Sequence, residues 1–350
     1  MTAEPAAPFL AACRCEPVGR TPVWFMRQAG RSLPEYRALK GTRSILDVLT
    51  HPDLAAEITL QPVRRHRVDA AILFSDIIVP VWATGFGVDI VAGRGPVVER
   101  PLRTPADLER LRPLDPEADT GYVLETVRIL ATELPADVPL IGFAGAPFTV
   151  ASYLVEGGPS RDFAKVKALM HADPGTWEAL VDRLADMAIA SLGAQVDAGA
   201  DAVQLFDSWV GALSPKDYER FALPATRRVL DAVGALGVPT ILFGVGTGEL
   251  LGLMASCGPN VVGVDWRVPL DLARRRVGPG RAVQGNLDPG ACLGPVEVAL
   301  EEARDVLRRA GGAPGYVFNL GHGVLPETDP GVLSALVELV HAEGPAGLRS

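Results

Sequence analysis

The 350-residue sequence has few cysteines, namely Cys13, Cys15, Cys257 and Cys292, and none of them forms a Cys-x-x-Cys pair. Neither a disulfide framework nor a zinc knuckle is therefore indicated. Cys13 and Cys15 fall in a polar N-terminal stretch, where we expect both thiols to be exposed to solvent and to bind nothing. The sequence therefore predicts no metal site.

Long apolar runs and a basic excess are also missing. No run approaches the ~18 apolar residues of a membrane helix. Residues 10–13 resemble a lipoprotein cleavage box, but the apolar run before them is too short for a signal sequence. The formal net charge is −9, which argues against a nucleic-acid binder. We expect a cytoplasmic protein without membrane or nucleic-acid partners, although a local arginine cluster can still bind an anionic small molecule.

Short, nearly continuous apolar runs recur along the chain and are separated by helix-like stretches. Such runs are typical of parallel strands that are covered on both faces. The expected strands are Pro22–Met26, Ala70–Phe74, Pro139–Phe143, Ala202–Phe206, Pro239–Phe243, Val261–Asp265, Ala282–Gly285 and Tyr316–Asn319. Amphipathic patterns predict helices at Thr176–Ala198, Pro215–Leu236 and Pro295–Ala310.

Eight strands that alternate with helices predict a single (β/α)8 TIM barrel of the α/β class, with a doubly wound sheet as the alternative. Polar residues at the ends of the runs favour the barrel, because barrel active sites gather at the carboxyl ends of the strands. These residues are Arg27, Asp76, Asp207, Ser208, Asp265, Asn286, Asp288 and His322. We expect residues 1–20 to form an N-terminal arm and residues 21–345 to form the barrel domain, with Val88–Asp119 as an excursion between barrel units.

Two arginines, Arg27 and Arg31, lie four residues apart just after the first expected strand, with Gly30 between them. The planar guanidinium presents a fork of donors that matches a carboxylate, and glycine lets the backbone approach a ligand closely. This spacing predicts an anion site, and surface arginines in a loop are the alternative interpretation.

Asp76 closes an otherwise apolar run, so its carboxylate must be paired or must meet a ligand. A helix N-cap or a structural ion pair would explain it equally well. Residues 142–158 are rich in small side chains but contain no phosphate-binding loop, and Tyr153 within them fits a packing role or a site role.

His322 lies between Gly321 and Gly323, which leave its ring unshielded, and this favours a functional role. The other four histidines occur in helix-like or terminal contexts. We expect them at the surface: His51, His66, His171 and His341.

Together these segments resemble the uroporphyrinogen decarboxylase family. Residues 25–37, Phe-Met-Arg-Gln-Ala-Gly-Arg-Ser-Leu-Pro-Glu-Tyr-Arg, are similar to its N-terminal signature, and residues 142–158 are similar to its second signature. The motifs at 74–77, 204–208, 284–289 and 319–323 follow in the family's order, so the resemblance spans residues 20–340. It implies a (β/α)8 barrel and a homodimer that converts uroporphyrinogen III to coproporphyrinogen III by removing four acetate carboxyl groups.

The positions that match the family's substrate-contacting motifs are Arg27, Gln28, Ala29, Gly30, Arg31, Asp76, Tyr153, Ser208 and His322. By this resemblance the two arginines bind substrate carboxylates, and residues 28–30 contribute backbone contacts. Asp76 faces the pyrrole N–H groups, and the last three residues complete the substrate shell.

Loss of CO₂ from an acetate arm releases electrons that need a sink, which many decarboxylases obtain from a cofactor. A protonated pyrrole ring can accept them instead, so we expect no cofactor. A fixed carboxylate in a dry pocket would stabilise the cationic ring, and Asp76 is assigned this catalytic role. Arg27 or Arg31 would orient the departing carboxyl group. Tyr153, His322 and a bound water are the candidates for the general acid.

Two alternatives use the same sequence features. A cobalamin-linked zinc methyltransferase of the same barrel superfamily would need a His-x-Cys element after a strand, but residues 244–248 read Gly-Val-Gly-Thr-Gly. A non-catalytic tetrapyrrole carrier would need the arginines but not Asp76. The presence of Asp76 and the absence of a His-x-Cys element favour the decarboxylase.

Overall fold

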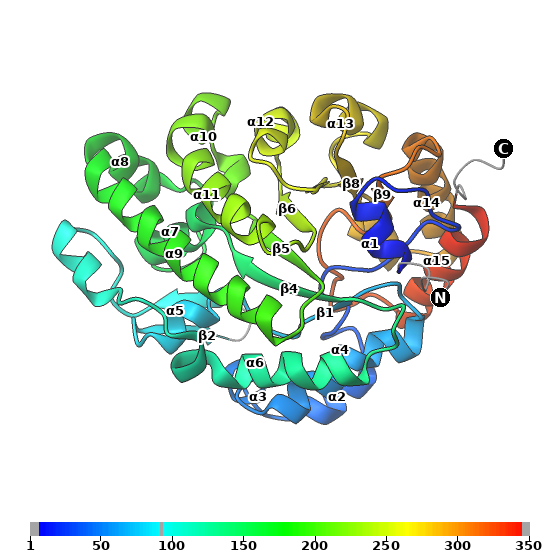
Figure 1. The fold of residues 1–350 in the computed structure, drawn as a ribbon, viewed down its shortest axis with the longest axis horizontal. Coiled ribbons are helices and arrows are strands. Elements are labelled where there is room, and N and C mark those ends of the chain that lie inside the picture. The colour runs from blue at the N-terminus through cyan, green and yellow to red at the C-terminus, as the bar shows by residue number, and fades with distance from the viewer. Residues whose placement is uncertain (1–6, 92–93, 345–350) are drawn as a thin grey trace.

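The computed structural model describes residues 7–91 and 94–344. Parts of three expected segments lie outside the described residues: residues 1–6 of the arm, 92 and 93 of the excursion, and 345 at the end of the barrel domain. Helices are arranged around a central, curled sheet (Figure 1). None of the helices within the described ranges is both long and apolar enough to span a bilayer.

Seven parallel strands form the main sheet in the order β1-β4-β5-β6-β7-β8-β9. Their bounds are β1 Ala71–Ile72, β4 Leu140–Gly145, β5 Ala202–Asp207, β6 Thr240–Gly244, β7 Val261–Gly263, β8 Ala282–Gln284 and β9 Tyr316–Val317. A doubly wound sheet requires a switch point where the strand order reverses. The order here follows the chain throughout, so the expected parallel α/β sheet is confirmed and the doubly wound alternative is wrong.

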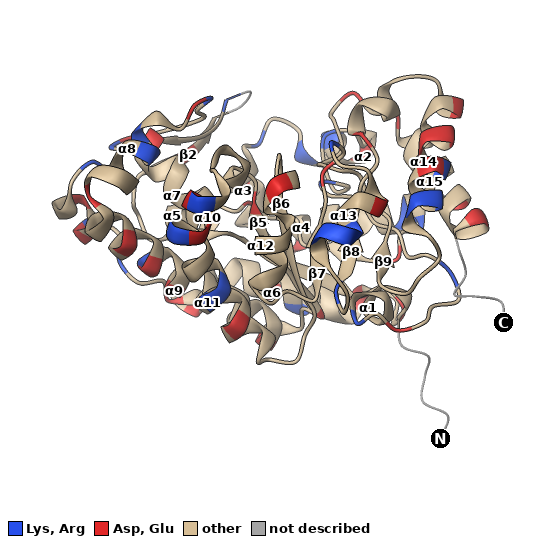
Figure 2. Cartoon of the chain, turned by 90° about the horizontal axis from the view of Figure 1, so that it is seen from above, with Lys and Arg blue, Asp and Glu red and all other residues tan. Residues whose placement is uncertain are grey.

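The α-helices precede, connect and follow these strands. They are α1 Pro8–Cys13, α2 Pro34–Lys40, α3 Ile45–Leu49, α4 Pro52–His66, α5 Val79–Ala83, α6 Pro116–Glu133, α7 Pro147–Glu156, α8 Ala164–Ala172, α9 Pro174–Ala198, α10 Pro215–Phe221, α11 Leu223–Gly234, α12 Leu251–Ser256, α13 Leu270–Val277, α14 Val296–Ala310 and α15 Pro330–Glu343. Short 3-10 helices are η1 Pro105–Arg110, η2 Val210–Ala212, η3 Gly248–Leu250 and η4 Pro289–Leu293. Acidic and basic residues are mixed along outer helices such as α9, α11 and α14 (Figure 2).

The excursion at Val88–Asp119 contains an antiparallel hairpin, formed by β2 Val88–Val91 and β3 Gly95–Val98. Its backbone is tied to the C-terminal part of α7. Val98 N donates to Gly157 O at 3.0 Å, and Leu102 N donates to Leu154 O at 2.8 Å. The excursion therefore packs against α7, and its expected end at Asp119 lies in the first turn of α6, which begins at Pro116.

The first expected strand, Pro22–Met26, forms a single parallel bridge, between Val23 and Phe318, in place of a regular strand. Its backbone is nevertheless hydrogen-bonded on both edges. On one edge Phe318 N donates to Pro22 O at 2.9 Å, and on the other Asp69 N donates to Val23 O at 2.8 Å. This segment therefore lies between the chain that follows β9 and the chain that enters β1.

A buried chain of polar side chains crosses the interior of the sheet. Trp24 Nε1 donates to Gln284 Oε1 at 2.9 Å, and Gln284 Nε2 donates to Gln204 Oε1 at 3.1 Å. Gln204 lies on β5 and Gln284 on β8, with β6 and β7 between these two strands in the sheet. Their side chains can meet only because the sheet curls around a common interior.

One expected helix is divided in two. The segment predicted at Pro215–Leu236 forms α10 and α11, which are separated at Ala222. Pro224 lies in the first turn of α11, and proline has no N–H to continue the preceding helix. The expected helices at Thr176–Ala198 and Pro295–Ala310 are confirmed as α9 and α14, with small shifts at their first residues.

The expected exposure of Cys13 and His66 is wrong, and Cys15 and His341 are only partly exposed. Cys13 is only 1% exposed because α1 packs its apolar face on the end of the sheet near β9, and Cys15 is half-buried. His66 is also buried rather than at the surface, and its Nδ1 lies 2.8 Å from Ser334 Oγ. Helix α1 and the last turn of α4 thus contribute to the core.

Asp69, which is 1% exposed, holds the Pro22–Met26 segment on the edge that faces β1. Its carboxylate accepts hydrogen bonds from Val23 N at 2.8 Å and from the Arg20 guanidinium at 2.6 Å, and it lies 2.7 Å from His341 Nε2. We expect Asp69→Ala to lower the free energy of unfolding by about 3 kcal/mol, because three buried or half-buried donors lose their acceptor. Urea unfolding measures this change.

Arg20→Ala is the matched control, because it removes only the exposed partner of the same carboxylate. It should cost about 1 kcal/mol or less. Equal losses in the two variants would contradict the anchoring role of Asp69.

Candidate functional site

The polar residues expected at the strand ends lie at one edge of the sheet. Asp207 is the last residue of β5, and Ser208 follows it. Asp265 comes two residues after β7, Asp76 four after β1, and His322 five after β9. Because the strands are parallel, their carboxyl ends meet at the same edge, where barrel-type folds place their sites.

Arg27 follows the first segment in a left-handed conformation, with φ of 61°. The backbone on either side of it is fixed, since Met26 N donates to Asn319 Oδ1 at 3.1 Å and Met26 O accepts from Val324 N at 2.8 Å. The Arg27 side chain then lies against Gly323. A Cβ on that glycine would be 2.5 Å from Arg27 Cδ, so only glycine leaves room for the guanidinium arm.

The loop after Arg27 divides into an anchored residue and two free backbone donors. Gln28 is fully buried, with Oε1 accepting from Phe25 N at 3.0 Å and Nε2 donating to Ala70 O at 3.0 Å. The Gln28 N–H is itself used in a turn with Phe25 O. Among the described residues, the N–H groups of Ala29 and Gly30 have no acceptor, so they are available to a ligand.

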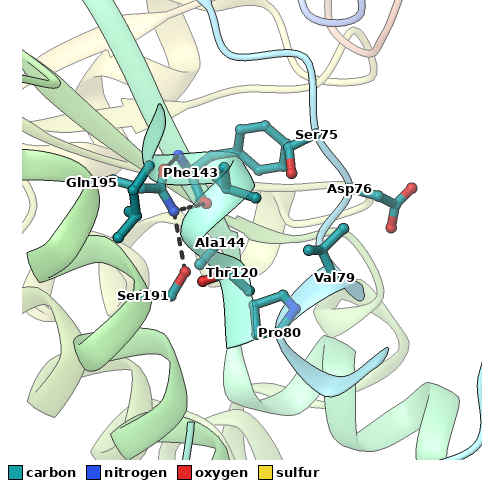
Figure 3. A pocket seen from close by; sticks show the side chains of 11 residues that line it. Ser75, Asp76, Val79, Pro80, Thr120, Phe143, Ala144, Ser191 and Gln195 are labelled. Atoms are coloured by element: carbon teal, nitrogen blue, oxygen red, sulfur yellow. Dashed lines mark hydrogen bonds between the residues drawn. The ribbon is translucent and has the colours of Figure 1, made fainter. Parts of the chain in front are cut away.

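Asp76 lies half-buried between β1 and α5. Its Oδ1 accepts from Ile78 N at 3.0 Å, an Asx-type turn that fixes the carboxylate. Burial raises the pKa of Asp76, while the Ile78 N–H and the charge of Arg27 lower it. A small cavity lies behind it, next to Gln195, which hydrogen-bonds Phe143 and Ser191, and the Asp76 carboxylate points away from these groups (Figure 3).

Tyr153 lies on α7, with its ring edge-on to Trp209 at a centroid distance of 5.9 Å. Burial raises the pKa of Tyr153; the Trp209 side chain and the charge of Arg27 lower it, and the charge of Asp76 raises it. The charge of Arg27 therefore acts on both Asp76 and Tyr153, and the charge of Asp76 acts on Tyr153, although the three residues are far apart in the sequence.

A second buried carboxylate, Asp207, supports the segment of α7 that carries Tyr153. Thr149, one helical turn before Tyr153 on α7, donates from Oγ1 to Asp207 Oδ1 at 2.7 Å and accepts from Trp209 N at 3.1 Å. Burial raises the pKa of Asp207 to about 7 despite the Thr149 hydrogen bonds. This network fixes α7 to the end of β5 and holds half-buried Ser208 between Asp207 and Trp209.

His322 is half-buried and precedes Gly323, against which the Arg27 side chain packs. Its Nδ1 accepts from Gly323 N at 2.7 Å, so the neutral ring carries its proton on Nε2. Burial lowers the pKa of His322 to about 4, with further lowering by the charges of Arg27 and Arg267. Phe243 and Trp266 pack edge-on against the ring at 6.3 and 6.4 Å.

The expected residues are thus only partly brought together. Arg27, Asp76, Tyr153 and His322 form one group, because the charge of Arg27 acts on each of the other three. Arg31 is exposed in the next turn, where its charge acts on the buried Tyr36. It forms the outer part of the same loop rather than the centre of the group.

Two features of this edge were not predicted from the sequence. Phe143, Phe206 and Phe243 form a row of edge-on rings across β4, β5 and β6, with centroids 5.4 and 6.1 Å apart. The apolar pattern of the sequence predicts only that these residues belong to strands. Trp266 and Arg267 follow the sixth expected strand directly, and their position after a run of apolar residues was the signal that could have found them.

The loop after β6 is held by a hydrogen bond from its backbone to a carboxylate. Gly246 N donates to Asp265 Oδ2 at 2.5 Å, and no His or Cys lies between Gly244 and Gly248. Within the described part of the chain, no group of three or more His, Cys, Asp and Glu side chains is placed to hold a metal ion. Nothing at this position supplies the ligands that a zinc methyltransferase would need.

The protonation of His322 can be measured directly. We expect its ring signals in NMR spectra to titrate with a pKa of about 4, assigned by their loss in His322→Asn. Because an unfolded histidine takes up its proton near pH 6.5, the free energy of unfolding should decrease as the pH falls from about 6.5 to about 4. A midpoint at or above 6.5 would contradict the buried, cation-flanked environment.

Comparisons with known proteins agree with one another on the family. The family model described as Uroporphyrinogen decarboxylase (URO-D) matches residues 4–343. Uroporphyrinogen decarboxylase of Streptomyces griseus subsp. griseus is 61% identical over 335 residues, which cover 96% of this chain and 91% of the relative. Uroporphyrinogen decarboxylase of Streptomyces coelicolor is 61% identical over 342 residues, which cover 98% of this chain and 96% of the relative.

Among solved structures, a methyltransferase from Methanosarcina mazei superposes with a TM-score of 0.78 at 24% identity, covering 95% of this chain and 97% of the other. At that identity the likeness shows a shared fold alone. The full-length family match and the identity to the two Streptomyces proteins go further than fold, and the chain belongs to the uroporphyrinogen decarboxylase family.

Proposed function

We propose that the chain removes the four acetate carboxyl groups of uroporphyrinogen III, giving coproporphyrinogen III and CO₂ without a cofactor. The observation that carries this proposal is the placement of Asp76. A fixed carboxylate lies within the field of Arg27 at the carboxyl edge of the sheet, beside groups that donate hydrogen bonds. An anion and a cation at one edge of the sheet suit a substrate with pyrrole N–H donors inside and carboxylates outside.

Asp76 accepts the pyrrole N–H groups and offsets the positive charge that forms during the reaction. A proton added to the ring carbon next to the one that bears the acetate makes the ring cationic. The C–C bond to the carboxylate then breaks, CO₂ leaves, and its electron pair moves into the ring. A second proton completes the methyl group while the ring loses the first proton, so each arm consumes one proton in total. The Ile78 N–H holds the carboxylate still, which spares reorganisation at that moment.

The loop after Arg27 binds the substrate's carboxylates. The Arg27 guanidinium is steered by Gly323, and Arg31 extends the same positive edge outward. The N–H groups of Ala29 and Gly30 add donors between them. Gln28 fixes the loop through its side chain rather than by contacting substrate, since its own N–H is already bonded.

His322 and Tyr153 act as neutral hydrogen-bond donors near pH 7. Burial lowers the pKa of His322 to about 4 and raises the pKa of Tyr153, so the imidazole and the phenol both stay uncharged. His322 then presents its Nε2–H, because Nδ1 is occupied by Gly323 N. A neutral imidazole is a poor acid, which favours Tyr153 or a bound water as the proton source. Ser208 completes the part of the site that Tyr153 lines.

The remaining features of the proposal concern assembly and location. The Pro22–Met26 segment acts as the eighth strand and closes the curled sheet into a (β/α)8 barrel, with hydrogen bonds to Phe318 and Asp69 as support. The barrel domain spans residues 21–345, and the preceding arm packs against it through α1. The enzyme works as a cytoplasmic homodimer without nucleic-acid or membrane partners.

The direct test incubates the purified, metal-stripped protein anaerobically with enzymatically generated uroporphyrinogen III. The products are oxidised and separated by carboxyl number. A ladder from eight to four carboxylates without added cofactor is the expected result. Binding without loss of carboxylates would point to a tetrapyrrole carrier, and activity that returns only with zinc would point to a methyltransferase.

Asp76→Ala should lower turnover by roughly 10²–10³-fold, because the cationic ring loses its fixed counter-charge. Asp76→Glu should keep part of the activity, since it retains the charge. Both variants are measured by CO₂ release and by thermal unfolding.

Asp197→Ala is the matched control, an exposed aspartate at the C-terminal end of α9, away from the carboxyl edge of the sheet. It should leave turnover unchanged. Near-normal turnover in folded Asp76→Ala protein would overturn the role of Asp76.

A further inference from the structure

Arg267 lies in the turn between β7 and α13. This turn is far from the loop of Arg27 in the sequence. Its side chain is 51% exposed, and the partner that fixes it, Asp265, is 1% exposed. An exposed cation that is held by a buried carboxylate keeps one position, although most exposed arginines move freely. The proposed function above gives this residue no role.

The guanidinium is fixed in two ways. Its NH1 donates to Asp265 Oδ2 at 2.8 Å, and its Cζ lies 4.0 Å above the centre of the Trp266 ring. Stacking on an aromatic face and pairing with a carboxylate are both favourable for the planar arginine fork. The fork is therefore pre-oriented before any ligand arrives.

The fixed fork belongs to the same site as His322. The Trp266 ring that carries Arg267 packs edge-on against the His322 ring at 6.4 Å. Burial lowers the pKa of His322 most, and the charges of Arg27 and Arg267 both lower it further. His322 thus lies within the fields of two cations, one in the loop after residues 22–26 and one in the turn after β7.

Donor groups of Arg267 are left over for a ligand. Asp265 is satisfied independently, because it also accepts from Gly246 N at 2.5 Å and from Arg267 N at 3.1 Å. Only NH1 of the guanidinium is used, and within the described residues Nε and NH2 have no acceptor. Two parallel N–H groups with a common direction are the pattern that binds a carboxylate.

We propose that Arg267 binds a non-reacting carboxylate arm of the substrate, as a second anchoring point at the end of β7, separate from the Arg27 loop. This inference rests on the proposed function, whose substrate carries eight carboxylates. Arg27, Arg31 and two backbone N–H groups cannot bind all of them from one side. An anchor on the β7 side would hold the macrocycle at a second edge while Asp76 holds its centre.

The test compares full-length wild-type protein with Arg267→Gln and Arg267→Lys on enzymatically generated uroporphyrinogen III. Arg267→Gln should raise KM about fivefold with kcat within twofold, because a half-exposed charge pair contributes modestly to binding. Arg267→Lys should recover part of the affinity. The KM of the wild type should rise more steeply with salt than that of Arg267→Gln, because one screened contact is missing in the variant.

Arg275→Gln is the matched control, since Arg275 is also exposed and pairs with an aspartate, Asp271, at 3.0 Å in the same α13 region. Its KM should stay at the wild-type value. An unchanged KM in Arg267→Gln overturns the inference while the activity of the wild type stands. A lower kcat with a lower unfolding temperature and an unchanged KM also overturns it, because Arg267 would then only support Asp265. Loss of activity in the wild type itself would refute the proposed function instead.

Discussion

The structure depends on the hydrogen bonds that hold residues 22–26 on both of their edges. Phe318 binds one edge, and Asp69 binds the other through its backbone and its carboxylate. Because Met26 is then fixed by Asn319 and Val324, the chain leaves it in a left-handed turn at Arg27. The first segment of the chain and the last strand of the sheet thus jointly set the direction of the guanidinium.

Burial is the second constraint, because it acts on the pKa values of Asp76, Tyr153 and His322 in a way that favours the neutral form of each. It raises the pKa of Asp76 and of Tyr153 and lowers that of His322. Each of these groups is pushed toward its neutral form, and specific neighbours decide how far. Ile78 N–H and Arg27 favour the carboxylate of Asp76, whereas two arginines keep His322 neutral. The site therefore combines the carboxylate of Asp76 with two neutral donors, Tyr153 and His322, and with the positive charges of the nearby arginines.

Much of the fold follows from local patterns. Continuous apolar runs indicate parallel strands, and the confirmed helices α9 and α14 show a regular apolar face. Some of the errors have local causes, and others arise from contacts between distant parts of the chain. Pro224 divides a predicted helix, and residues 22–26 pair over too short a length to form a regular strand. Cys13 and His66 are buried because α1 and the last turn of α4 find partners that are distant in the sequence.

The sequence by itself determined the residue types of the site and their order after the strands, because a motif such as Arg27-Gln28-Ala29-Gly30-Arg31 is contiguous. It also determined the family, through motifs spread over residues 20–340. Only the tertiary structure decided which of these residues lie close enough for their charges to interact. It also decided that Gln28 anchors the loop while the N–H groups of Ala29 and Gly30 stay free. It alone placed Arg267 on Trp266 beside His322. The reason is physical: charge interactions and burial depend on distances through space, which residues far apart in the chain acquire only when the sheet curls.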